Sequence, residues 1–169
     1  MTDVRTLQGR LRADGLRVGV VAARFNQRVV DPLLAGAIDC LRRHGVEDDH
    51  LVVLRVPGAW ELPLALQELA ASGTVDALVA LAVVIRGETP HFDYVCAECS
   101  KGVAAVSSQH RLPIGFGVLT TDTSAQAVER AGGKAGNKGW EAAQAALEMA
   151  DLVAEVRQLG DGGDPAATS

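Results

Sequence analysis

The chain has few cysteines and few aromatic residues. Aromatic residues make up 4% of the 169 residues, and the three cysteines are Cys40, Cys96 and Cys99. A small, odd number of cysteines argues against a disulfide framework. Cys96 and Cys99 form a lone C-x-x-C, but a structural zinc site needs four ligands and no other ligands lie nearby in the sequence. We therefore expect ordinary helix residues here, at least one of them buried, and no metal site.

Positive charge and long hydrophobic runs are also lacking. Lys and Arg number 16 against 21 Asp and Glu, which gives a formal net charge of −5. An acidic chain with scattered basic residues is a poor candidate for nucleic-acid binding. No apolar run reaches the roughly 18 residues of a membrane span, and the first 16 residues lack a signal-peptide core. We expect no nucleic-acid partner, no membrane partner and, by default, a cytoplasmic protein.

Strand and helix patterns alternate along the chain. Short runs rich in Val, Leu and Ile predict strands at residues 17–22, 51–56, 77–85 and 114–119. Helical spacing of apolar residues predicts a first helix that ends at residue 44. It also predicts helices at residues 60–72, 90–110, 122–131 and 140–158. Two starts are open for the first helix. Either Asn26 begins it and Pro32 bends it, or Asp31 and Pro32 form its cap and first position.

This alternation predicts an α/β fold, a three-layer αβα sandwich with a four-stranded parallel sheet of the flavodoxin-like kind. Near-continuous apolar strands are typical of parallel sheets that helices cover on both faces. We expect an N-terminal arm at residues 1–15, a single domain at 16–158 and a disordered tail at 159–169. Sheets of this kind bind ligands beyond the carboxyl ends of their strands.

The most informative segment is RGETPHFDY, directly after the third predicted strand. Thr89 suits the N-cap of the following helix and Pro90 its first position. Unpaired backbone N–H groups near Gly87, Glu88 and Thr89 would then form a cradle for a phosphate. His91, in the first helical turn, would be within reach of the bound group and can take and return protons. The segment predicts chemistry on a phosphorylated small molecule.

The few aromatic residues follow the predicted strands. Phe25 follows the first, Trp60 the second and Phe92 the third, while Phe116 lies in or near the fourth. Rings gathered at one sheet edge suit a flat ligand held by stacking, although each residue taken singly could belong to the core. Glu61 either favours a helix start or accepts hydrogen bonds from substrate hydroxyl groups.

Basic residues accompany a glycine-rich segment at residues 132–139. Arg130 precedes it, Lys138 lies near its end and Lys134 lies in its middle. They form either a solvated surface or the counter-charge that a phosphate held by backbone groups would otherwise lack. The segment is not a Walker motif, because it neither follows a strand nor ends in Gly-Lys-Ser/Thr.

Four motifs together resemble the lumazine synthase family. They are RFN at 24–26, GAWE at 58–61, RGETPHFDY at 86–94 and the segment 129–139, within a match over roughly residues 16–156. The resemblance implies the flavodoxin-like fold and a transferase of riboflavin biosynthesis without metal or organic cofactor. The reaction would condense 5-amino-6-(D-ribitylamino)uracil with 3,4-dihydroxy-2-butanone 4-phosphate, giving 6,7-dimethyl-8-ribityllumazine, phosphate and water.

The resemblance also implies site residues by position. His91 would be the proton donor, and Glu88, Thr89 and Arg130 would bind the butanone phosphate. The residues implied for ribitylaminouracil are Phe25, Ala59, Trp60, Glu61, Val83, Val84, Ile85, Phe116 and Lys138. Among all of these, Phe116, Arg130 and Lys138 match positions that reach in from a neighbouring subunit.

Assembly follows from the same resemblance. The family forms pentamers, some of which build sixty-subunit shells, and the short segment 132–139 resembles that of shell-forming members. A riboflavin synthase partner is left open. The chain departs from the family pattern at Ala59, where many members have Ser, at Glu88, where many have Ala, and at Gly115, where several have a polar residue. Ala59 and Gly115 would remove side-chain hydrogen bonds and weaken pyrimidine binding.

Three other functions stay open on the sequence. They are a non-catalytic flavin- or lumazine-binding protein on the same fold, an archaeal-type riboflavin synthase, and a purely structural shell. His91, Arg130 and the phosphate turn favour the enzyme. A carrier of riboflavin or lumazine has no use for these groups, and a riboflavin synthase, which dismutates two lumazines, requires no phosphate clamp.

Overall fold

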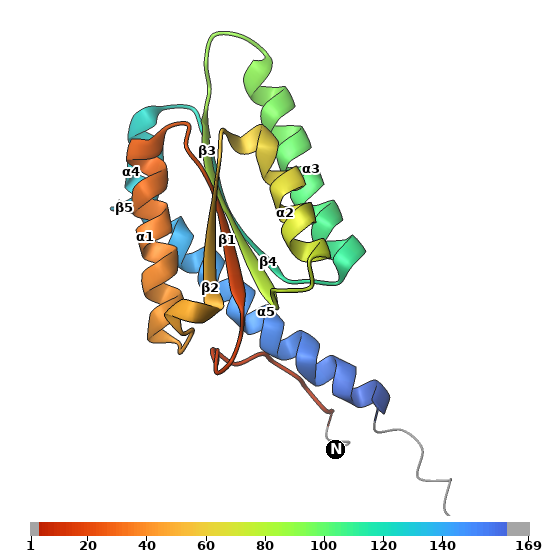
Figure 1. Ribbon diagram of the computed structural model, residues 1–169. Coiled ribbons are helices and arrows are strands. Elements are labelled where there is room, and N and C mark those ends of the chain that lie inside the picture. Colours follow the sequence, from red (N-terminus) through yellow and green to blue (C-terminus); the bar gives the residue numbers. More distant parts are fainter. Residues whose placement is uncertain (1–3, 162–169) are drawn as a thin grey trace, which may run out of the picture.

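The computed structural model describes residues 4–161, in which a parallel sheet lies between two layers of helices (Figure 1). The strands of the sheet are β1 (Val18–Ala23), β2 (Leu51–Val56), β3 (Ala77–Ile85) and β4 (Ile114–Thr121). They lie in the order β2-β1-β3-β4, and each neighbouring pair is parallel. Val18 is level with both Leu51 and Ala77, so the carboxyl ends of the strands meet at one edge. The predicted four-stranded parallel sheet is confirmed.

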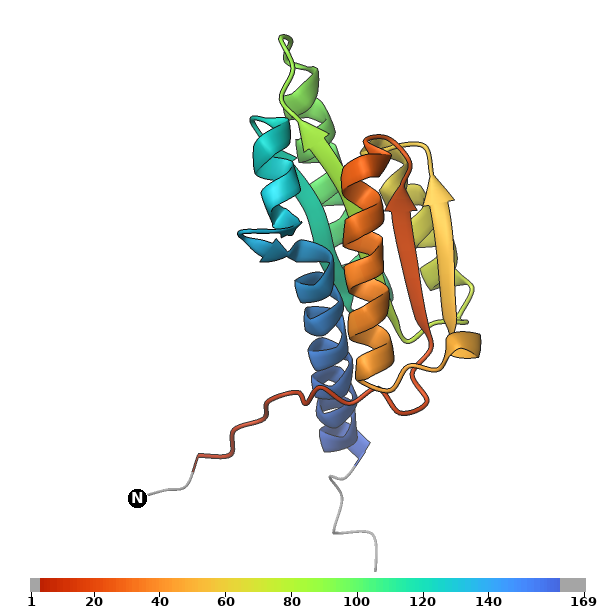
Figure 2. The ribbon, with the colours of Figure 1, turned by 90° about the vertical axis from the view of Figure 1, so that its left-hand side faces the viewer.

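Helices cover both faces of the sheet (Figures 1 and 2). One layer consists of α1 (Gln27–Arg43), α4 (Ser124–Arg130) and α5 (Lys138–Asp161). The other consists of α2 (Leu62–Ala71) and α3 (His91–His110). This is the flavodoxin-like sandwich expected from the sequence. No helix among residues 4–161 combines the length and the hydropathy that crossing a membrane would require.

Side chains of the central strands alternate between two cores. Val20 and Val79 pack with the layer of α1 and α5, whereas Val21 and Leu78 pack with the layer of α2 and α3. All four side chains are fully buried. Successive residues of a strand point to opposite faces, so a strand covered on both sides is apolar at every position. This is why β3 reads as an unbroken apolar run.

The start of α1 settles one of the open alternatives. Asn26 has φ 58° and ψ 42°, the left-handed conformation that Asn tolerates better than most residues. Its carbonyl accepts the N–H groups of Val29 at 2.9 Å and Val30 at 3.1 Å. The helix therefore begins at Gln27 and contains Pro32, and the later start is wrong.

The start of α3 corrects a predicted cap. The helix begins at His91, and Pro90 precedes it with φ −64° and ψ −4°. No side chain caps this end, so the prediction that Thr89 is the N-cap is wrong. Pro90 itself closes the first turn, because its carbonyl accepts the N–H of Asp93 at 3.0 Å.

The glycine-rich segment forms a short antiparallel hairpin, β5 (Ala131–Gly133) and β6 (Gly136–Asn137). The Oδ1 atom of Asn137 accepts the N–H groups of Gly139 at 2.9 Å and Trp140 at 3.2 Å. Its Nδ2 donates to the carbonyl of Pro32 at 2.9 Å. Asn137 thus starts α5 before the expected residue 140 and links it to α1.

The chain ends differ from the expected boundaries. Helix α5 continues to Asp161, so residues 159–161 are helical, and the rest of the expected tail, 162–169, lies outside the described residues. Two residues near the end of the N-terminal arm bond to the domain of the same subunit. The N–H of Arg10 donates to Asp151 Oδ2 at 2.7 Å, and the N–H of Ala13 donates to the carbonyl of His44 at 3.2 Å.

Candidate active site

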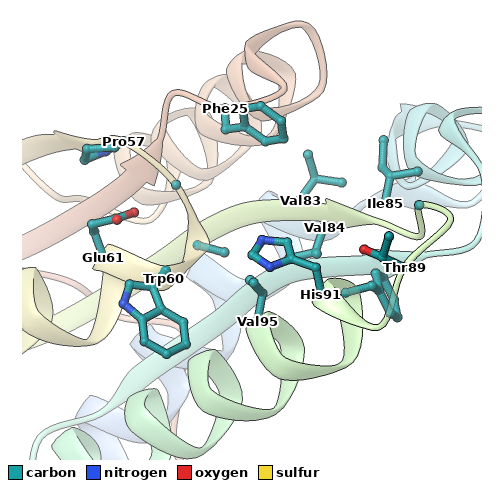
Figure 3. Close-up of a pocket in the computed structure, with 14 residues that line it drawn as sticks. Phe25, Pro57, Trp60, Glu61, Val83, Val84, Ile85, Thr89, His91 and Val95 are labelled. Carbon is teal, nitrogen blue, oxygen red and sulfur yellow. The ribbon is translucent and has the colours of Figure 1, made fainter.

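A cavity of about 480 Å³ lies at the carboxyl ends of β1, β2 and β3 (Figure 3). Its walls come from the turns that follow these strands and from the start of α3. The lining residues are Phe25, residues 57–61, residues 83–85, Gly87, Thr89, His91, Phe92 and Val95. Doubly wound sheets bind ligands at this edge, so the cavity lies where the fold favours a site.

Two backbone hydrogen bonds join the turn after β1 to the turn after β2. The N–H of Arg24 donates to the carbonyl of Val56 at 2.7 Å, and the N–H of Phe25 donates to the carbonyl of Pro57 at 2.9 Å. The left-handed conformation of Asn26 then turns the chain into α1. Phe25 is thereby held at the mouth of the cavity by backbone contacts.

Two aromatic rings at the cavity are exposed. Phe25 is 70% exposed and Trp60 is 58% exposed, whereas the aliphatic side chain of Val83 at the cavity wall is buried. Exposed rings beside an apolar wall offer flat surfaces for stacking a heterocycle. Glu61 lies on the same turn as Trp60 and adds a carboxylate to the lining. The cavity therefore suits a flat ring with hydroxyl groups attached.

The turn between β3 and α3 offers donors to an anion. Within residues 4–161, the amides of Gly87, Glu88 and Thr89 have no hydrogen-bond acceptor. Gly87 and Thr89 line the cavity, and Glu88 does not. These amides precede the N-terminus of α3, where backbone N–H groups and the helix dipole attract negative charge. The turn has the donors that a phosphate requires.

His91 lies at the first position of α3 and lines the same cavity. Figure 3 shows its imidazole ring pointing away from the helix, toward the turn that carries Trp60. An imidazole between an anion turn and stacking rings can move protons on a ligand that spans both. The geometry thus places an acid–base group at the junction of the two candidate subsites.

Other sequence candidates lie outside the cavity of their own chain. Arg130 Nη1 donates to the carbonyl of Gln126 at 3.0 Å, and Lys138 Nζ pairs with Glu141 at 2.6 Å. Phe116, on β4, lines a separate hollow with residues of α3 and is 47% exposed. Among the described residues that line the main cavity, none is Lys or Arg. Among the described residues, the cavity lining thus offers a phosphate no permanently charged cation.

Sequence reasoning misses two lining residues, Pro57 and Val95. Pro57 follows β2 directly and belongs to the same turn as the GAWE motif. Val95 lies four residues after His91 on α3, so it shares the helix face of His91. That spacing is a signal from which Val95 can be found.

Packing explains the residue present at two positions where the chain departs from the family pattern, Gly115 and Ala59. A Cβ atom at Gly115 would lie 2.0 Å from the carbonyl oxygen of Ala142, so only glycine lets β4 approach α5 at this point. Ala59 is 7% exposed and belongs to the core beneath α2 and α3. Of the departures, only Ala59 lines the cavity.

The C-x-x-C pair lies on α3 and has the character of ordinary helix residues. Cys99 is 1% exposed, and burial raises the pKa of its thiol to about 11. Burial is also the main cause that raises the pKa of Cys96. Nucleophilic attack needs a thiolate, which a raised pKa disfavours.

The fold and the cavity define a flavodoxin-like α/β protein with a small-molecule site at the carboxyl edge of its sheet. Residues 15–154 match the family model described as 6,7-dimethyl-8-ribityllumazine synthase. The chain is similar to the 6,7-dimethyl-8-ribityllumazine synthase of Desulfovibrio desulfuricans, with 58% identity over 92% of this chain and 100% of the relative. It is also similar to that of Aquifex aeolicus, with 55% identity over 89% and 97%. The chain belongs to the 6,7-dimethyl-8-ribityllumazine synthase family, which confirms the resemblance.

Proposed function

We propose that Phe25, Trp60 and Glu61 hold ribitylaminouracil, that the turn at residues 87–89 holds butanone phosphate, and that His91 moves protons between them. The chain has lumazine synthase activity, a transferase activity of riboflavin biosynthesis. The proposal concerns which groups perform the reaction. A cytoplasmic location belongs to the same proposal.

One observation carries the assignment of residues. The amides of residues 87–89, unpaired within the described chain, share a cavity with two exposed rings and the imidazole of His91. An anion at the turn and a heterocycle on the rings would place their reacting ends beside His91. Holding two reactants in this way can lower a barrier by up to about 7–11 kcal/mol.

The reaction would begin at the amine of the uracil. The amine attacks the ketone carbon of butanone phosphate, and loss of water leaves a C=N bond. A proton then leaves the carbon beside that bond, and phosphate leaves from the next carbon with the bonding electron pair. The amides of residues 87–89 would stabilise the departing phosphate, because they donate to the charge that develops on it.

Ring closure would complete the product. The enol left by phosphate elimination becomes a ketone when its terminal carbon takes up a proton. The carbon skeleton of the intermediate then rotates, so that the new carbonyl faces the ribityl-bearing nitrogen. That nitrogen attacks, and a second water leaves. His91 is the lining residue best suited to accept and return these protons, a role worth about 10²–10⁴-fold in rate.

We infer that a neighbouring copy of the chain completes the site. The cavity lining in the described chain holds no cation, while Arg130, Lys138 and Phe116 lie outside it. Large apolar side chains also stay exposed on one subunit, including Leu64 at 68% and Tyr94 at 69%. Such exposure is typical of surfaces that a partner covers. Assembly into pentamers, or into sixty-subunit shells, is the proposed state.

A direct assay tests the function. Purified protein mixed with both substrates should produce lumazine fluorescence and free phosphate together, and neither signal should appear when one substrate is omitted. Light scattering measures the assembly, and a riboflavin synthase held inside a shell would sediment with it. Protein that binds lumazine but forms none from the two substrates would instead be a carrier.

A further inference from the structure

Arg86 is the first residue after β3, and its side chain connects segments on both sides of the candidate phosphate turn. Its Nε donates to Asp122 Oδ1 at 2.9 Å, and its Nη1 donates to Asp93 Oδ1 at 3.4 Å. Its guanidinium carbon lies 4.3 Å from the ring centroid of Phe92. Asp122 follows β4, whereas Phe92 and Asp93 belong to the first turn of α3. One side chain thus holds the start of α3 against the end of β4.

The β4 side of this connection is well anchored. The backbone N–H of Arg86 donates to the carbonyl of Thr121 at 2.8 Å, and Thr121 is 5% exposed. The N–H of Asp122 donates at 2.9 Å to Oε1 of Gln126, the residue that forms the capping box of α4 with Thr123. Asp122 is therefore a fixed partner, and the contacts of Arg86 limit where the first turn of α3 can lie.

The turn itself has little to hold its shape. Residues 87–90 are exposed, and the amides of residues 87–89 are unpaired within the described chain. Their geometry therefore depends on the two ends of the turn, the last residue of β3 and the first turn of α3. Arg86 lies at one end and contacts the other through Phe92 and Asp93. His91 directly precedes Phe92 and shares its helical turn.

We propose that Arg86 is a positioning residue for the lumazine synthase reaction. It fixes the position of the amides of residues 87–89 relative to the ring of His91. The inference deepens the proposed function and rests on its phosphate turn. Arg86 acts through Asp122, Asp93 and Phe92 without touching the substrate.

The charges around Arg86 argue against direct phosphate binding. One guanidinium faces two carboxylates, Asp93 and Asp122, so the group carries a net charge of −1 at neutral pH. The hydrogen bond to Asp122 is the main cause that raises the pKa of Arg86, which keeps it charged and paired. A phosphate would have to displace a carboxylate to reach this guanidinium. The paired arrangement is that of a side chain that links the start of α3 to the end of β4.

The contacts of Arg86 should matter more for the site than for global stability. The side chains of Arg86, Asp93 and Asp122 are 48%, 63% and 67% exposed, and exposed ion pairs contribute little to folding. A catalytic geometry is more sensitive, since displacement by about 1 Å can cost about 10²-fold in rate. Substitution of Arg86 should therefore lower catalytic activity while it leaves the free energy of unfolding almost unchanged.

The test compares Arg86→Gln and Arg86→Lys in the assembled enzyme. Both variants should raise KM for butanone phosphate about tenfold and lower kcat, while KM for ribitylaminouracil stays within about twofold. Lysine should fail to rescue, because it keeps the charge but loses the planar fork and the stacking on Phe92. Asp122→Asn should reproduce the effect, and the double variant should cost little more than either single one.

Two control variants separate a positioning role from the general loss of a surface ion pair and from failure of the phosphate turn. Arg43→Gln removes another exposed ion pair, with Asp39 on α1, and should leave both KM values unchanged. Wild-type KM values in Arg86→Gln, or full rescue by lysine, would overturn the positioning role. Thr89→Pro tests the phosphate turn separately, because proline removes one of its three amide donors. If Thr89→Pro raises KM for butanone phosphate and Arg86→Gln does not, only the role of Arg86 fails. If Thr89→Pro leaves it unchanged, the phosphate turn fails, and the inference about Arg86 fails with it.

Discussion

The backbone N–H of Phe25 donates to the carbonyl of Pro57 at 2.9 Å, and this bond joins two turns that lie far apart in the sequence. It places an exposed ring beside the turn that carries Trp60 and Glu61. Because the bond is made by the backbone, it survives side-chain substitution at residue 25. The ring of Phe25 can thus be removed without changing the turn that presents it.

Phe25→Ala should therefore weaken binding of ribitylaminouracil alone. We expect KM for that substrate to rise about 3- to 10-fold, since a stacked ring contributes about 0.5–1.5 kcal/mol. The melting temperature should change little, because the side chain is 70% exposed. Steady-state kinetics with each substrate varied in turn measures the effect. An equal rise in KM for butanone phosphate would argue against a stacking role.

His91→Ala should slow turnover without abolishing it. Positioning of the two substrates remains in the variant, and only the proton transfers are lost, so kcat should fall about 10²–10⁴-fold. Thermal unfolding and binding of inorganic phosphate should stay close to wild type. Complete inactivity in a folded variant that still binds phosphate would contradict this division of roles.

Arg130→Ala should raise KM for butanone phosphate strongly if a neighbouring subunit supplies the clamp. The decisive experiment mixes unfolded His91→Ala and Arg130→Ala chains in equal amounts and refolds them together. Random co-assembly gives about a quarter of the sites a wild-type His91 and a wild-type Arg130, so activity should reappear. Mixing without refolding is the control. No recovery in a properly assembled mixture would place both residues in the site of one chain.

Gly115→Ala should destabilise the fold. The added Cβ would meet the carbonyl oxygen of Ala142 at 2.0 Å, which forces β4 and α5 apart at a cost of about 1–3 kcal/mol. Gly87→Ala is a matched control for stability, because a Cβ there has no atom within 4 Å among the described residues. Urea denaturation measures both. Similar free energies of unfolding for the two variants would show that β4 and α5 relax easily.

Acid should weaken the salt bridge between Arg17 and Asp76, which links the starts of β1 and β3. Asp76 accepts side-chain hydrogen bonds from Arg17 at 2.9 and 3.1 Å, and these chiefly lower the pKa of Asp76. A carboxyl with a lowered folded-state pKa adds stability above its unfolded pKa of about 3.9, and that stability is lost as pH falls through the folded value.

Asp76→Asn tests this tie. The variant should lose about 1 kcal/mol or less at pH 7, since the Asp76 side chain is 36% exposed and solvent screens the pair. The difference from wild type should narrow below pH 4. Denaturation curves at several pH values measure it, and a difference that stays constant down to pH 2 would contradict the expected linkage.

Local sequence patterns predict the strands well and the helix starts poorly. The nine apolar residues of β3 agree at both ends with the predicted strand, because burial on both faces leaves a continuous signal. The start of α5 depends on Asn137, whose side chain also donates to Pro32 of α1. A cap that depends on a partner more than a hundred residues away has no local signature.

The features of the candidate site also fall into those that local sequence patterns predict and those that they do not. The sequence by itself determined which residues follow strands, and parallel pairing brings such residues to one edge, so Phe25, Trp60, Thr89 and His91 meet as expected. Only the tertiary structure decided that Arg86 is paired with two carboxylates and that Arg130 turns to its own helix. The physical reason is that strand periodicity acts along the chain, whereas the partner of a long charged side chain is chosen across space.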